Sequence, residues 1–227
     1  MISSSCYSYA FKNIFFLNAK KGYQLVTQST LPSIYLVRHG QTEWALAGRH
    51  TGRTDMILTP EGERQASTLK ERLQGLQFAQ VLTSPLLRAK KTCELAGFGD
   101  RMLEDADLME WDYGDYEGLT SREIRAKHPD WSTYKHGFPN GESVDAVAAR
   151  GARVATHLKS LSGNVLVFSH GHFLRFVAVS WLGLKKKQAG LLMLSTASVS
   201  VLGFDHNNID EPAIALWNDN HHLVQLP

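Results

Sequence analysis

The chain has 227 residues, 43% of them hydrophobic and 20% charged, which is the balance of a globular protein and excludes the disordered and fibrous classes. Lysine and arginine number 24 and aspartate and glutamate 22, so the net charge of +2 gives no general basis for binding nucleic acid or an anionic membrane. Any affinity for anions must therefore come from a local group of residues.

Cysteine content and apolar stretches restrict the cellular setting. The two cysteines, Cys6 and Cys93, are too few for a disulfide framework and lack the paired spacing of a zinc site. The longest apolar stretch, residues 173–184, is interrupted by Arg175 and is shorter than the roughly 20 residues that cross a bilayer. We therefore expect a soluble, cytoplasmic protein without a structural metal.

Residues 1–33 differ in composition from the rest of the chain. They contain three lysines, six serines and no acidic residue, and the first carboxylate of the chain is Glu43. Organelle transit peptides are rich in serine and poor in acidic residues, but they also carry arginine, which this segment lacks. We interpret it as an N-terminal extension, with organelle targeting as the alternative, and place one domain over residues 34–227.

Strand and helix patterns alternate from residue 34 onward. The β-branched and aromatic run at 34–37 predicts a buried strand, and the Thr-Pro pair at 59–60 predicts the start of a helix. A short strand is expected at 81–83, and the Ser-Pro pair at 84–85 indicates the start of the next helix. The unit is a strand followed by a helix.

The second half of the chain repeats this alternation. Residues 120–123 have the spacing of a capping box, and a stripe of Val, Ala and Leu predicts a long helix over 144–161. A continuous apolar strand at 164–168 precedes an apolar helix at 173–184. Two further strands are expected at 198–204 and 213–217. Continuous apolar strands interleaved with helices indicate an α/β fold, a three-layer α/β/α sandwich around a mostly parallel sheet.

Four polar side chains follow predicted strands at the point where each strand ends. Arg38 and His39 follow the first strand, Arg88 comes within a turn of the second, and His170 follows the strand at 164–168. Ligands of open α/β sheets lie outside the carboxyl ends of the strands. Arginine matches phosphate oxygens with a planar fork of donors, and a neutral histidine can attack phosphorus. The sequence therefore predicts a phosphate pocket with a histidine nucleophile at this edge of the sheet.

Gly40 and Gly171 each follow one of these histidines directly. Glycine allows a tight turn and lets backbone N–H groups approach an anion closely. Taken singly, a histidine beside a glycine at a strand end is more often an ordinary loop residue. The prediction therefore depends on the conjunction of the arginines and histidines.

Several motifs in order resemble one known family. The run Leu-Val-Arg-His-Gly-Gln-Thr-Glu-Trp at 36–44 resembles the Arg-His-Gly signature of the histidine phosphatase superfamily, also called the phosphoglycerate mutase-like family. The later landmarks of the family follow in order: His-Thr-Gly at 50–52, Leu-Thr-Pro-Glu-Gly at 58–62, Thr-Ser-Pro-Leu-Leu-Arg-Ala at 83–89 and Ser-His-Gly at 169–171. The resemblance extends from residue 34 to about 217 and implies the phosphoglycerate mutase-like fold.

The resemblance also implies roles for individual residues. His39 matches the phosphorylated nucleophile, with the Gly40 carbonyl accepting a hydrogen bond from its other ring nitrogen, and Arg38, Arg88 and His170 match the phosphate pocket. Further substrate contacts are implied at Gly40, Gln41, Thr42, Thr51, Gly52 and Gly171. The family commonly has asparagine where this chain has Ala45, which removes one phosphate contact.

Two residues of the last predicted helix have less defined roles. We expect His172 to form a wall of the pocket or to contact substrate, with a structural role as the alternative. Arg175 is predicted to be a structural ion-pair partner. No residue is expected to bind a metal or a cofactor.

Four carboxylates within 108–118 are candidates for a general acid. Displacing an alkoxide requires protonation of the leaving oxygen, and such an acid is usually a carboxyl whose pKa is raised by burial. The family resemblance selects Glu110. Asp112 and Asp115 are interpreted as solvated loop residues, and Glu117 as a hydrogen-bond partner of the backbone.

The pattern around the acid favours a phosphatase. Cofactor-dependent mutases of the family show Glu-Arg-x-Tyr-Gly at the acid, whereas Trp111 follows Glu110 here. The stretch at 110–118, with those at 140–143 and 208–212, most closely resembles the sedoheptulose bisphosphatase branch. We predict a phosphomonoesterase that forms a phosphohistidine and acts on a small sugar phosphate or bisphosphate.

Two other functions stay open. A phosphoglycerate mutase is the main alternative. A non-catalytic module that binds phosphorylated ligands is a remote one, because such a module would usually have lost His39, His170 or Glu110. The expected partner is a small phosphorylated substrate, with no nucleic acid and no membrane, and the sequence leaves homo-oligomer formation open.

Overall fold

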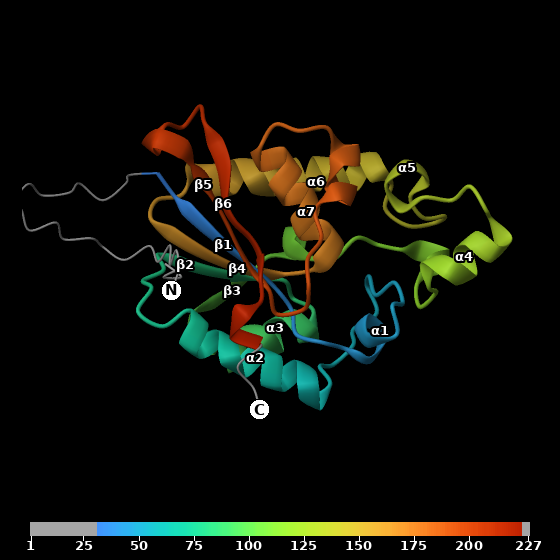
Figure 1. Cartoon of the computed structure of the whole chain (residues 1–227), viewed down its shortest axis with the longest axis horizontal. Coiled ribbons are helices and arrows are strands. Elements are labelled where there is room, and N and C mark those ends of the chain that lie inside the picture. The colour runs from blue at the N-terminus through green and yellow to red at the C-terminus, as the bar shows by residue number, and fades with distance from the viewer. Residues whose placement is uncertain (1–30, 224–227) are drawn as a thin grey trace, which may run out of the picture.

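A six-stranded mixed sheet forms the centre of the molecule in the computed structural model, which describes residues 31–223 (Figure 1). The strand order is β3-β2-β4-β1-β5-β6. β1 to β4 run parallel to one another, whereas β5 and β6 are antiparallel neighbours at one edge. The strands are β1 (Ser33–Arg38), β2 (Gln80–Thr83), β3 (Met102–Glu104), β4 (Asn164–Ser169), β5 (Val199–Phe204) and β6 (Pro212–Asp219).

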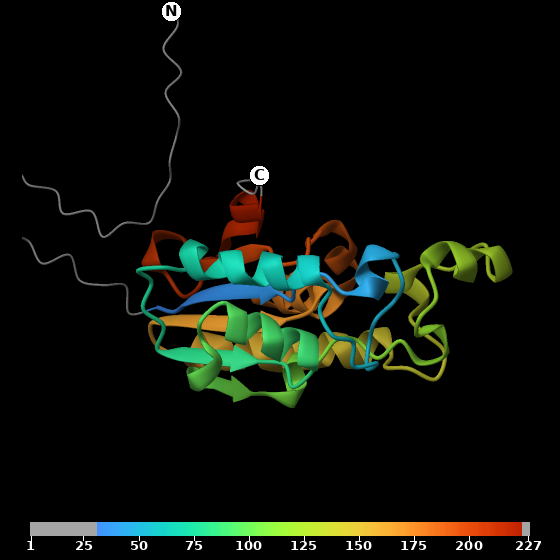
Figure 2. The same ribbon diagram turned by 90° about the horizontal axis from the view of Figure 1, so that it is seen from below.

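Helices pack on both faces of this sheet (Figure 2). α6 and α7 lie on one face and α2 and α3 on the other, while α1, α4 and α5 lie toward the end of the molecule where β1 ends (Figure 1). The helices are α1 (Glu43–Leu46), α2 (Pro60–Arg72), α3 (Leu87–Leu95), α4 (Ser121–Lys127), α5 (Thr133–His136), α6 (Val144–Ser160) and α7 (Gly171–Trp181).

Side chains of β1 alternate between two hydrophobic cores. Ile34 and Leu36 pack into a core shared with α6 and α7, and Tyr35 and Val37 pack into a second core shared with α2 and α3. Successive side chains of a strand point to opposite faces, so the sheet is covered on both sides. The predicted α/β fold, a three-layer sandwich with a mostly parallel central sheet, is confirmed.

Side-chain caps account for two helix starts that the sequence predicts. Thr59 Oγ1 accepts the Gly62 N–H at 3.0 Å, and Pro60 occupies the first position of α2. Thr120 and Glu123 form the capping box at the start of α4. In both places the cap satisfies backbone N–H groups that have no partner within the helix.

The structure corrects two predicted boundaries and adds a strand. α3 begins at Leu87 and not at Ser84, because the Ser84 hydroxyl bonds the Leu86 N–H ahead of the helix and is directed to the site described below. α7 begins at Gly171 and ends at Trp181, so it starts directly after His170. β3 was not predicted, because this edge strand has only three residues and two of its side chains are exposed, so its sequence lacks a recognisable hydrophobic pattern.

The predicted N-terminal extension, residues 1–33, lies outside the described residues except for its last three, and Ser33 already begins β1. Its role and the boundary of the domain stay predictions. Between residues 31 and 223 no helix is both long and apolar enough to cross a membrane.

Candidate active site

Two histidines meet where the parallel strands β1 and β4 end. The pairing register places Arg38 opposite Ser169, and the His39 N–H donates to the Ser169 carbonyl at 3.0 Å. The ring centroids of His39 and His170 lie 5.2 Å apart, and both side chains are buried. The register of the sheet therefore brings together the two histidines that the sequence predicts as site residues.

The hydrogen bond of His39 to its own loop determines which ring nitrogen is free. His39 Nδ1 lies 2.7 Å from the Gly40 carbonyl, which can only accept, so Nδ1 carries the proton. Burial, together with the charges of Arg88 and Arg38, holds the pKa of His39 well below its ordinary value. The ring is therefore neutral near pH 7, with its lone pair on Nε2.

His170 is held by a serine from the neighbouring strand end. Its Nε2 atom lies 2.7 Å from Ser84 Oγ, and its buried Nδ1 atom has no hydrogen-bond partner. Burial, followed by the charge of Arg88, holds the pKa of His170 well below its ordinary value. The sequence analysis missed Ser84 as a site residue, although its place directly after β2, beside β4, was a usable signal.

Arg88 is fully buried and binds mainly to backbone. Its Nη1 donates to the Thr54 carbonyl at 3.0 Å, and its Nη2 donates to the carbonyls of Thr51 at 3.2 Å and Gly52 at 2.8 Å. The Nε–H is buried without a partner. Arg88 therefore holds the loop at 51–54 and does not offer the free bidentate fork that its predicted phosphate contact assumed.

Arg38 reaches the same edge from the last position of β1. Its Nη1 donates to the Leu194 carbonyl at 2.6 Å, and its Nε is buried without a partner. A Cβ atom at position 171 would lie 3.1 Å from this Nε, so Gly171 gives the guanidinium room beside the start of α7. This close approach is a physical reason for glycine directly after His170.

Arg175 departs from its predicted role. Among residues 31–223 no carboxylate lies within ion-pair distance of it, so the predicted structural ion pair is wrong. Its Nη1 donates to the Tyr134 hydroxyl at 3.1 Å, and its Nε is buried without a partner. Residues three apart on a helix share a face, so its spacing from His172 was the signal that could have placed Arg175 in the site.

Four buried nitrogens of these side chains lack hydrogen-bond partners: Nε of Arg38, Arg88 and Arg175, and Nδ1 of His170. Leaving a buried polar group unsatisfied costs roughly 1–3 kcal/mol, so native structures rarely keep several in one place without a functional reason. Three of the four belong to guanidinium groups. The arrangement indicates a site for an anion whose oxygen atoms accept these hydrogen bonds.

A cavity of 250 Å³ opens at this edge of the sheet. Three arginines line it and Glu110 supplies its one lining carboxylate, so the cavity favours anions. Ala45 lines it as well, and its methyl group replaces the hydrogen-bonding side chain that the family commonly has there. The lining residues are Arg38, His39, Ala45, Gly48, Arg49, His50, Thr51, Glu110, Tyr113, Ser121, Gly171, His172 and Arg175.

Backbone donors fix the Glu110 carboxylate, which lines the same cavity as His39. It is 4% exposed and accepts the N–H groups of Trp111 at 3.0 Å, His172 at 3.1 Å and Phe173 at 2.8 Å. The last two belong to the first turn of α7, where the helix dipole is positive. Glu110 is therefore buried, as predicted, and is held against the start of the helix that follows His170.

Two predicted substrate contacts next to His39 have other partners. The Gly40 N–H donates to Thr92 Oγ1 at 3.0 Å, and a Cβ at position 40 would lie 2.4 Å from the Gly62 carbonyl. The Gln41 side-chain oxygen accepts the Thr59 hydroxyl at 3.0 Å. Neither residue lines the cavity. Both fix the loop that carries His39 against α2 and α3.

Two further predicted contacts also serve local structure. Thr42 Oγ1 accepts the Ala45 N–H at 3.2 Å and caps α1. The Gly52 N–H donates to Glu117 Oε1 at 2.8 Å, which is the backbone role predicted for Glu117. Neither Thr42 nor Gly52 lines the cavity, whereas Thr51 does. Gly52 thus supports the loop that binds Arg88, and the substrate contacts of these residues stay predictions.

His172 lies in the cavity wall, one of the two positions expected for it. Its Nδ1 atom is 2.5 Å from the Tyr113 hydroxyl. Burial raises the pKa of Tyr113 and, with the charge of Arg175, lowers the pKa of His172, so both side chains are neutral near pH 7. A hydroxyl that donates to Nδ1 leaves Nε2–H of His172 as a donor.

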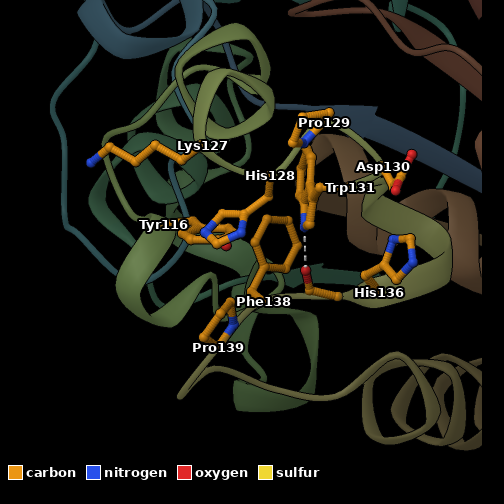
Figure 3. A pocket seen from close by; sticks show the side chains of 10 residues that line it. Tyr116, Lys127, His128, Pro129, Asp130, Trp131, His136, Phe138 and Pro139 are labelled. Carbon is orange, nitrogen blue, oxygen red and sulfur yellow. Dashed lines mark hydrogen bonds between the residues drawn. The ribbon is translucent and has the colours of Figure 1, made fainter.

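Two other features lie apart from the paired histidines. Trp131 and Phe138 line a surface cavity of 620 Å³ (Figure 3). The rings of both residues also pack on His50, which lines the wall of the active site. Asp205, His206 and Glu211 have potential metal-ligating atoms within 4.8 Å of one another, but all three are exposed. This cluster follows β5, which runs antiparallel to β1, and therefore lies at the opposite end of the sheet.

Comparison with known proteins places the chain in a family. The model of the histidine phosphatase superfamily (branch 1) matches residues 34–220. The chain belongs to this superfamily. A solved structure, the product of open reading frame Rv3214 from Mycobacterium tuberculosis, is similar to this chain with a TM-score of 0.76 and 37% identity, covering 83% of this chain and 98% of that one.

Curated relatives of this histidine phosphatase have more than one activity. It is 41% identical to an acid phosphatase of Mycobacterium tuberculosis, over 76% of this chain and 87% of the relative. It is 32% identical to a sedoheptulose 1,7-bisphosphatase of Saccharomyces cerevisiae, over 83% and 93%. It is 35% identical to a 2,3-bisphosphoglycerate-dependent phosphoglycerate mutase of Mesorhizobium japonicum, over 72% and 88%. The predicted family and phosphatase class are confirmed, and a phosphorylated small molecule is the substrate class.

Proposed function

We propose that the protein is a phosphomonoesterase that hydrolyses a small sugar phosphate or bisphosphate through a phosphohistidine on His39. The observation that carries the proposal is the neutral His39 ring, with Nε2 free, beside buried nitrogens of Arg38, Arg88 and His170 that have no hydrogen-bond partner. A nucleophile and the donors for its target anion are thus present at one edge of the sheet.

In the first step the lone pair of His39 Nε2 forms a bond to phosphorus while the ester P–O bond breaks. The guanidinium groups of Arg38 and Arg88 and the ring of His170 stabilise the charge on the phosphoryl oxygens. The leaving oxygen takes a proton from Glu110, whose carboxyl lines the same cavity.

In the second step water attacks phosphorus and the P–N bond breaks, which returns the lone pair to Nε2. The water proton goes to the Glu110 carboxylate, so this residue regains the proton that it gave in the first step. Inorganic phosphate leaves, and both residues return to their starting state. No metal enters this scheme because charged and polar side chains supply the electrostatic stabilisation.

The substrate class rests on lining residues of the cavity that the proposed reaction does not use. These are Arg49, His172 and Arg175. A second anionic group or the hydroxyls of a sugar would find donors there. A volume of 250 Å³ suits a small metabolite, and the likeness to a sedoheptulose bisphosphatase supports a sugar bisphosphate.

A phosphoglycerate mutase is the second candidate, because relatives with that name share 35% identity with this chain. A mutase returns the phosphoryl group to a second hydroxyl of its substrate and excludes water during turnover. A phosphatase transfers the group to water. The two functions therefore differ in whether the phosphate is released.

Phosphate release from a panel of sugar phosphates, sugar bisphosphates, phosphoglycerates and phosphoserine tests the proposal. We expect free phosphate to form fastest from a sugar phosphate or bisphosphate, without isomerisation of phosphoglycerate. Net isomerisation of phosphoglycerate with little phosphate release would establish the mutase. A preference for phosphoserine would retain the phosphatase and overturn the sugar phosphate.

A further inference from the structure

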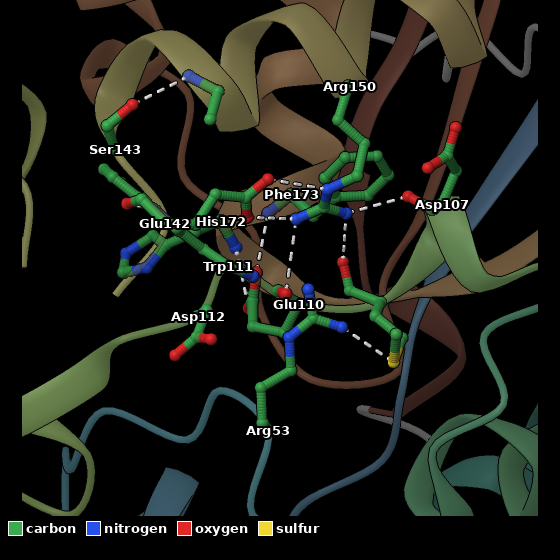
Figure 4. A network of polar contacts seen from close by, with 12 residues as sticks. Arg53, Asp107, Glu110, Trp111, Asp112, Glu142, Ser143, Arg150, His172 and Phe173 are labelled. Atoms are coloured by element: carbon green, nitrogen blue, oxygen red, sulfur yellow. Dashed lines mark hydrogen bonds and ion pairs between the residues drawn. The ribbon is translucent and has the colours of Figure 1, made fainter. Parts of the chain in front are cut away.

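Arg150 is a buried arginine next to the active site that the proposed reaction does not use. It lies in α6 and is 5% exposed. Its Nε donates to Glu142 Oε1 at 2.9 Å and its Nη2 to Glu142 Oε2 at 2.6 Å, a bidentate ion pair (Figure 4). Both partners are largely withdrawn from water, with side-chain exposures of 6% and 15%. Such a pair is costly to break, because the remaining charge would be left buried.

The other donors of Arg150 bind the loop that carries Glu110. Nη1 donates to the carbonyls of Asp107 at 2.8 Å and Met109 at 2.6 Å, and Nη2 donates to the carbonyl of Glu110 itself at 3.3 Å. A guanidinium has five N–H donors, and these contacts use all of them. Arg150 thus differs from Arg38, Arg88 and Arg175, each of which keeps an unpartnered Nε. It has no donor left for a substrate.

Glu142 holds the same loop from its other side. The Trp111 indole N–H donates to the Glu142 carbonyl at 2.7 Å, and the Glu142 N–H donates to the Asp112 carbonyl at 3.1 Å. Residues 109–113 have neither helix nor strand of their own. The backbone on both sides of Glu110 is therefore fixed by Arg150 and Glu142, which come from a distant part of the sequence.

A third contact links Arg150 to the helix that binds the carboxylate. The Arg150 guanidinium stacks 4.1 Å from the ring centroid of Phe173, and the Phe173 N–H donates to the Glu110 carboxylate. Arg150 consequently contacts the main chain of Glu110 and the residue that orients its side chain. Figure 4 shows the guanidinium between the Glu110 loop and Phe173.

We propose that Arg150, clamped by Glu142, is a positioning residue that holds the Glu110 carboxyl at the leaving oxygen of the substrate. This inference rests on the proposed role of Glu110 as proton donor. It predicts that losing Arg150 impairs the protonation of a basic leaving group more than it impairs attack on phosphorus. A displacement of the acid by about 1 Å is enough to cost a large factor in rate.

The test compares an alkyl substrate, glycerol 3-phosphate, with an aryl substrate, p-nitrophenyl phosphate, whose leaving group needs little protonation. In Arg150→Met we expect kcat for glycerol 3-phosphate to fall about 10²-fold and kcat for p-nitrophenyl phosphate to fall less than about 10-fold. Arg150→Lys restores one charge but not the fork, and we expect partial rescue of the alkyl reaction. Equal losses on both substrates, or no loss, would overturn the proposal.

Arg153→Met is the matched control. Arg153 lies on the same helix, is exposed and pairs through its side chain with the Asp107 carboxylate of the same loop at 3.0 Å. We expect this variant to keep the wild-type ratio of alkyl to aryl activity. If Arg153→Met changed the ratio as much as Arg150→Met does, the effect would come from general loosening of the loop and the proposal would fail.

Two further variants keep the test decisive. If Arg150→Met does not fold, as judged by circular dichroism, Glu142→Gln takes its place, because it weakens the clamp and leaves the carbonyl contacts of Arg150 intact. An unchanged alkyl to aryl ratio in folded Glu142→Gln would then overturn the proposal. Glu110→Gln is measured alongside. If it shows no dependence on the leaving group, the role of Glu110 is wrong, which separates failure of the proposed function from failure of the clamp.

Discussion

The two halves of the active site are built differently. His39 and His170 directly follow β1 and β4, and Arg88 lies in the first turn of α3, which comes after β2. The parallel register of β1, β2 and β4 determines where these residues meet. Glu110 lies on a loop without regular structure, which Arg150 and Glu142 hold through side-chain to backbone hydrogen bonds. In the proposed mechanism the first half binds and accepts the phosphoryl group, and the second half protonates the leaving group.

The two halves show two ways of positioning a functional side chain, one through strand pairing and one through side-chain hydrogen bonds to a loop. A strand end is positioned by backbone hydrogen bonds that any apolar strand sequence makes, so its site residues need little further support. A loop residue is positioned by particular side chains, so substitution of any one of them can displace it. Changes in the first half should therefore slow all substrates, whereas changes in the second half should discriminate between leaving groups.

The largest discriminating effect is expected from Glu110→Gln. Loss of the acid should slow an alkyl phosphate by about 10²- to 10⁴-fold, because a basic alkoxide needs its proton, and should slow p-nitrophenyl phosphate far less. Steady-state kcat on both substrates measures the ratio. Asp112→Asn is the control, since its carboxylate bonds the Gly114 N–H. A leaving-group dependence in Asp112→Asn with none in Glu110→Gln would move the acid by two residues.

A non-discriminating effect is expected from Arg88→Lys. The ammonium cannot satisfy the carbonyls of Thr51, Gly52 and Thr54 and also present a donor to phosphate, so kcat/KM should fall about 10²- to 10³-fold on alkyl and aryl substrates alike. Arg64→Lys, an exposed position on α2, is the control and should keep full activity. A fully active Arg88→Lys enzyme would reduce Arg88 to a general source of positive charge.

The same comparison explains what could be predicted from the sequence. Runs of hydrophobic residues predicted β1 and β4, and the Thr-Pro pair predicted the helix after Thr59. The polar residues directly after the strands predicted that His39 and His170 belong to one site. Ser84 was missed because its partner in the site, His170, lies 86 residues away and is made adjacent by strand pairing alone. Arg150 lies within the helix predicted over 144–161, but its role could not be predicted. Its partners come from residues 107–110 and from Glu142, and no pattern in the neighbouring sequence indicates them.

Other residues near the histidines were predicted only in part. Gly40, Gln41 and Thr42 carry the family motif, yet their contacts are to neighbouring backbone and side chains, which a motif does not reveal. The sequence predicted Arg175 as an ion-pair partner, whereas its contact is a tyrosine hydroxyl. The three-residue spacing from His172 was enough to predict that Arg175 shares a face of α7 with His172. Its partner, the Tyr134 hydroxyl, belongs to α5, a four-residue helix without a clear hydrophobic pattern.

A smaller effect is expected from Arg175→Met and depends on the substrate. If Arg175 binds a second anionic group, its loss should lower kcat/KM for a sugar bisphosphate by about 10- to 10²-fold and leave the corresponding monophosphate nearly unchanged. Initial rates of phosphate release measure both. Equal losses on the two substrates would place Arg175 at the reacting phosphate, and its assignment to a second anionic group would then be wrong.

A separate effect concerns stability and not catalysis, and it comes from the buried histidines His39, His50, His170 and His172. Burial lowers the pKa of each, that of His50 to about 4, whereas in the unfolded chain each has its ordinary value near 6.5. Below pH 6.5 the unfolded state binds more protons than the folded state. The free energy of unfolding should therefore fall between pH 7.5 and 5.5, by about 1 kcal/mol for each histidine.

Urea unfolding across this pH range measures the effect. His50→Phe fills the same aromatic cluster without a titrating group and should remove one histidine's share of the pH dependence. An unfolding free energy that does not change with pH in the wild type would mean that these rings are not held neutral, and the assignment of a free lone pair to His39 would lose its support.

Trapping of the phosphoenzyme tests the central claim, attack by His39 on phosphorus, most directly. After rapid quench with phosphate-labelled substrate, we expect an acid-labile, base-stable label on the peptide that contains His39. His39→Ala should carry no label and lose at least about 10³-fold in kcat, while His157→Ala, an exposed histidine of α6, should keep both. A wild-type enzyme that turns over without a label, or a label that persists in His39→Ala, would contradict the account.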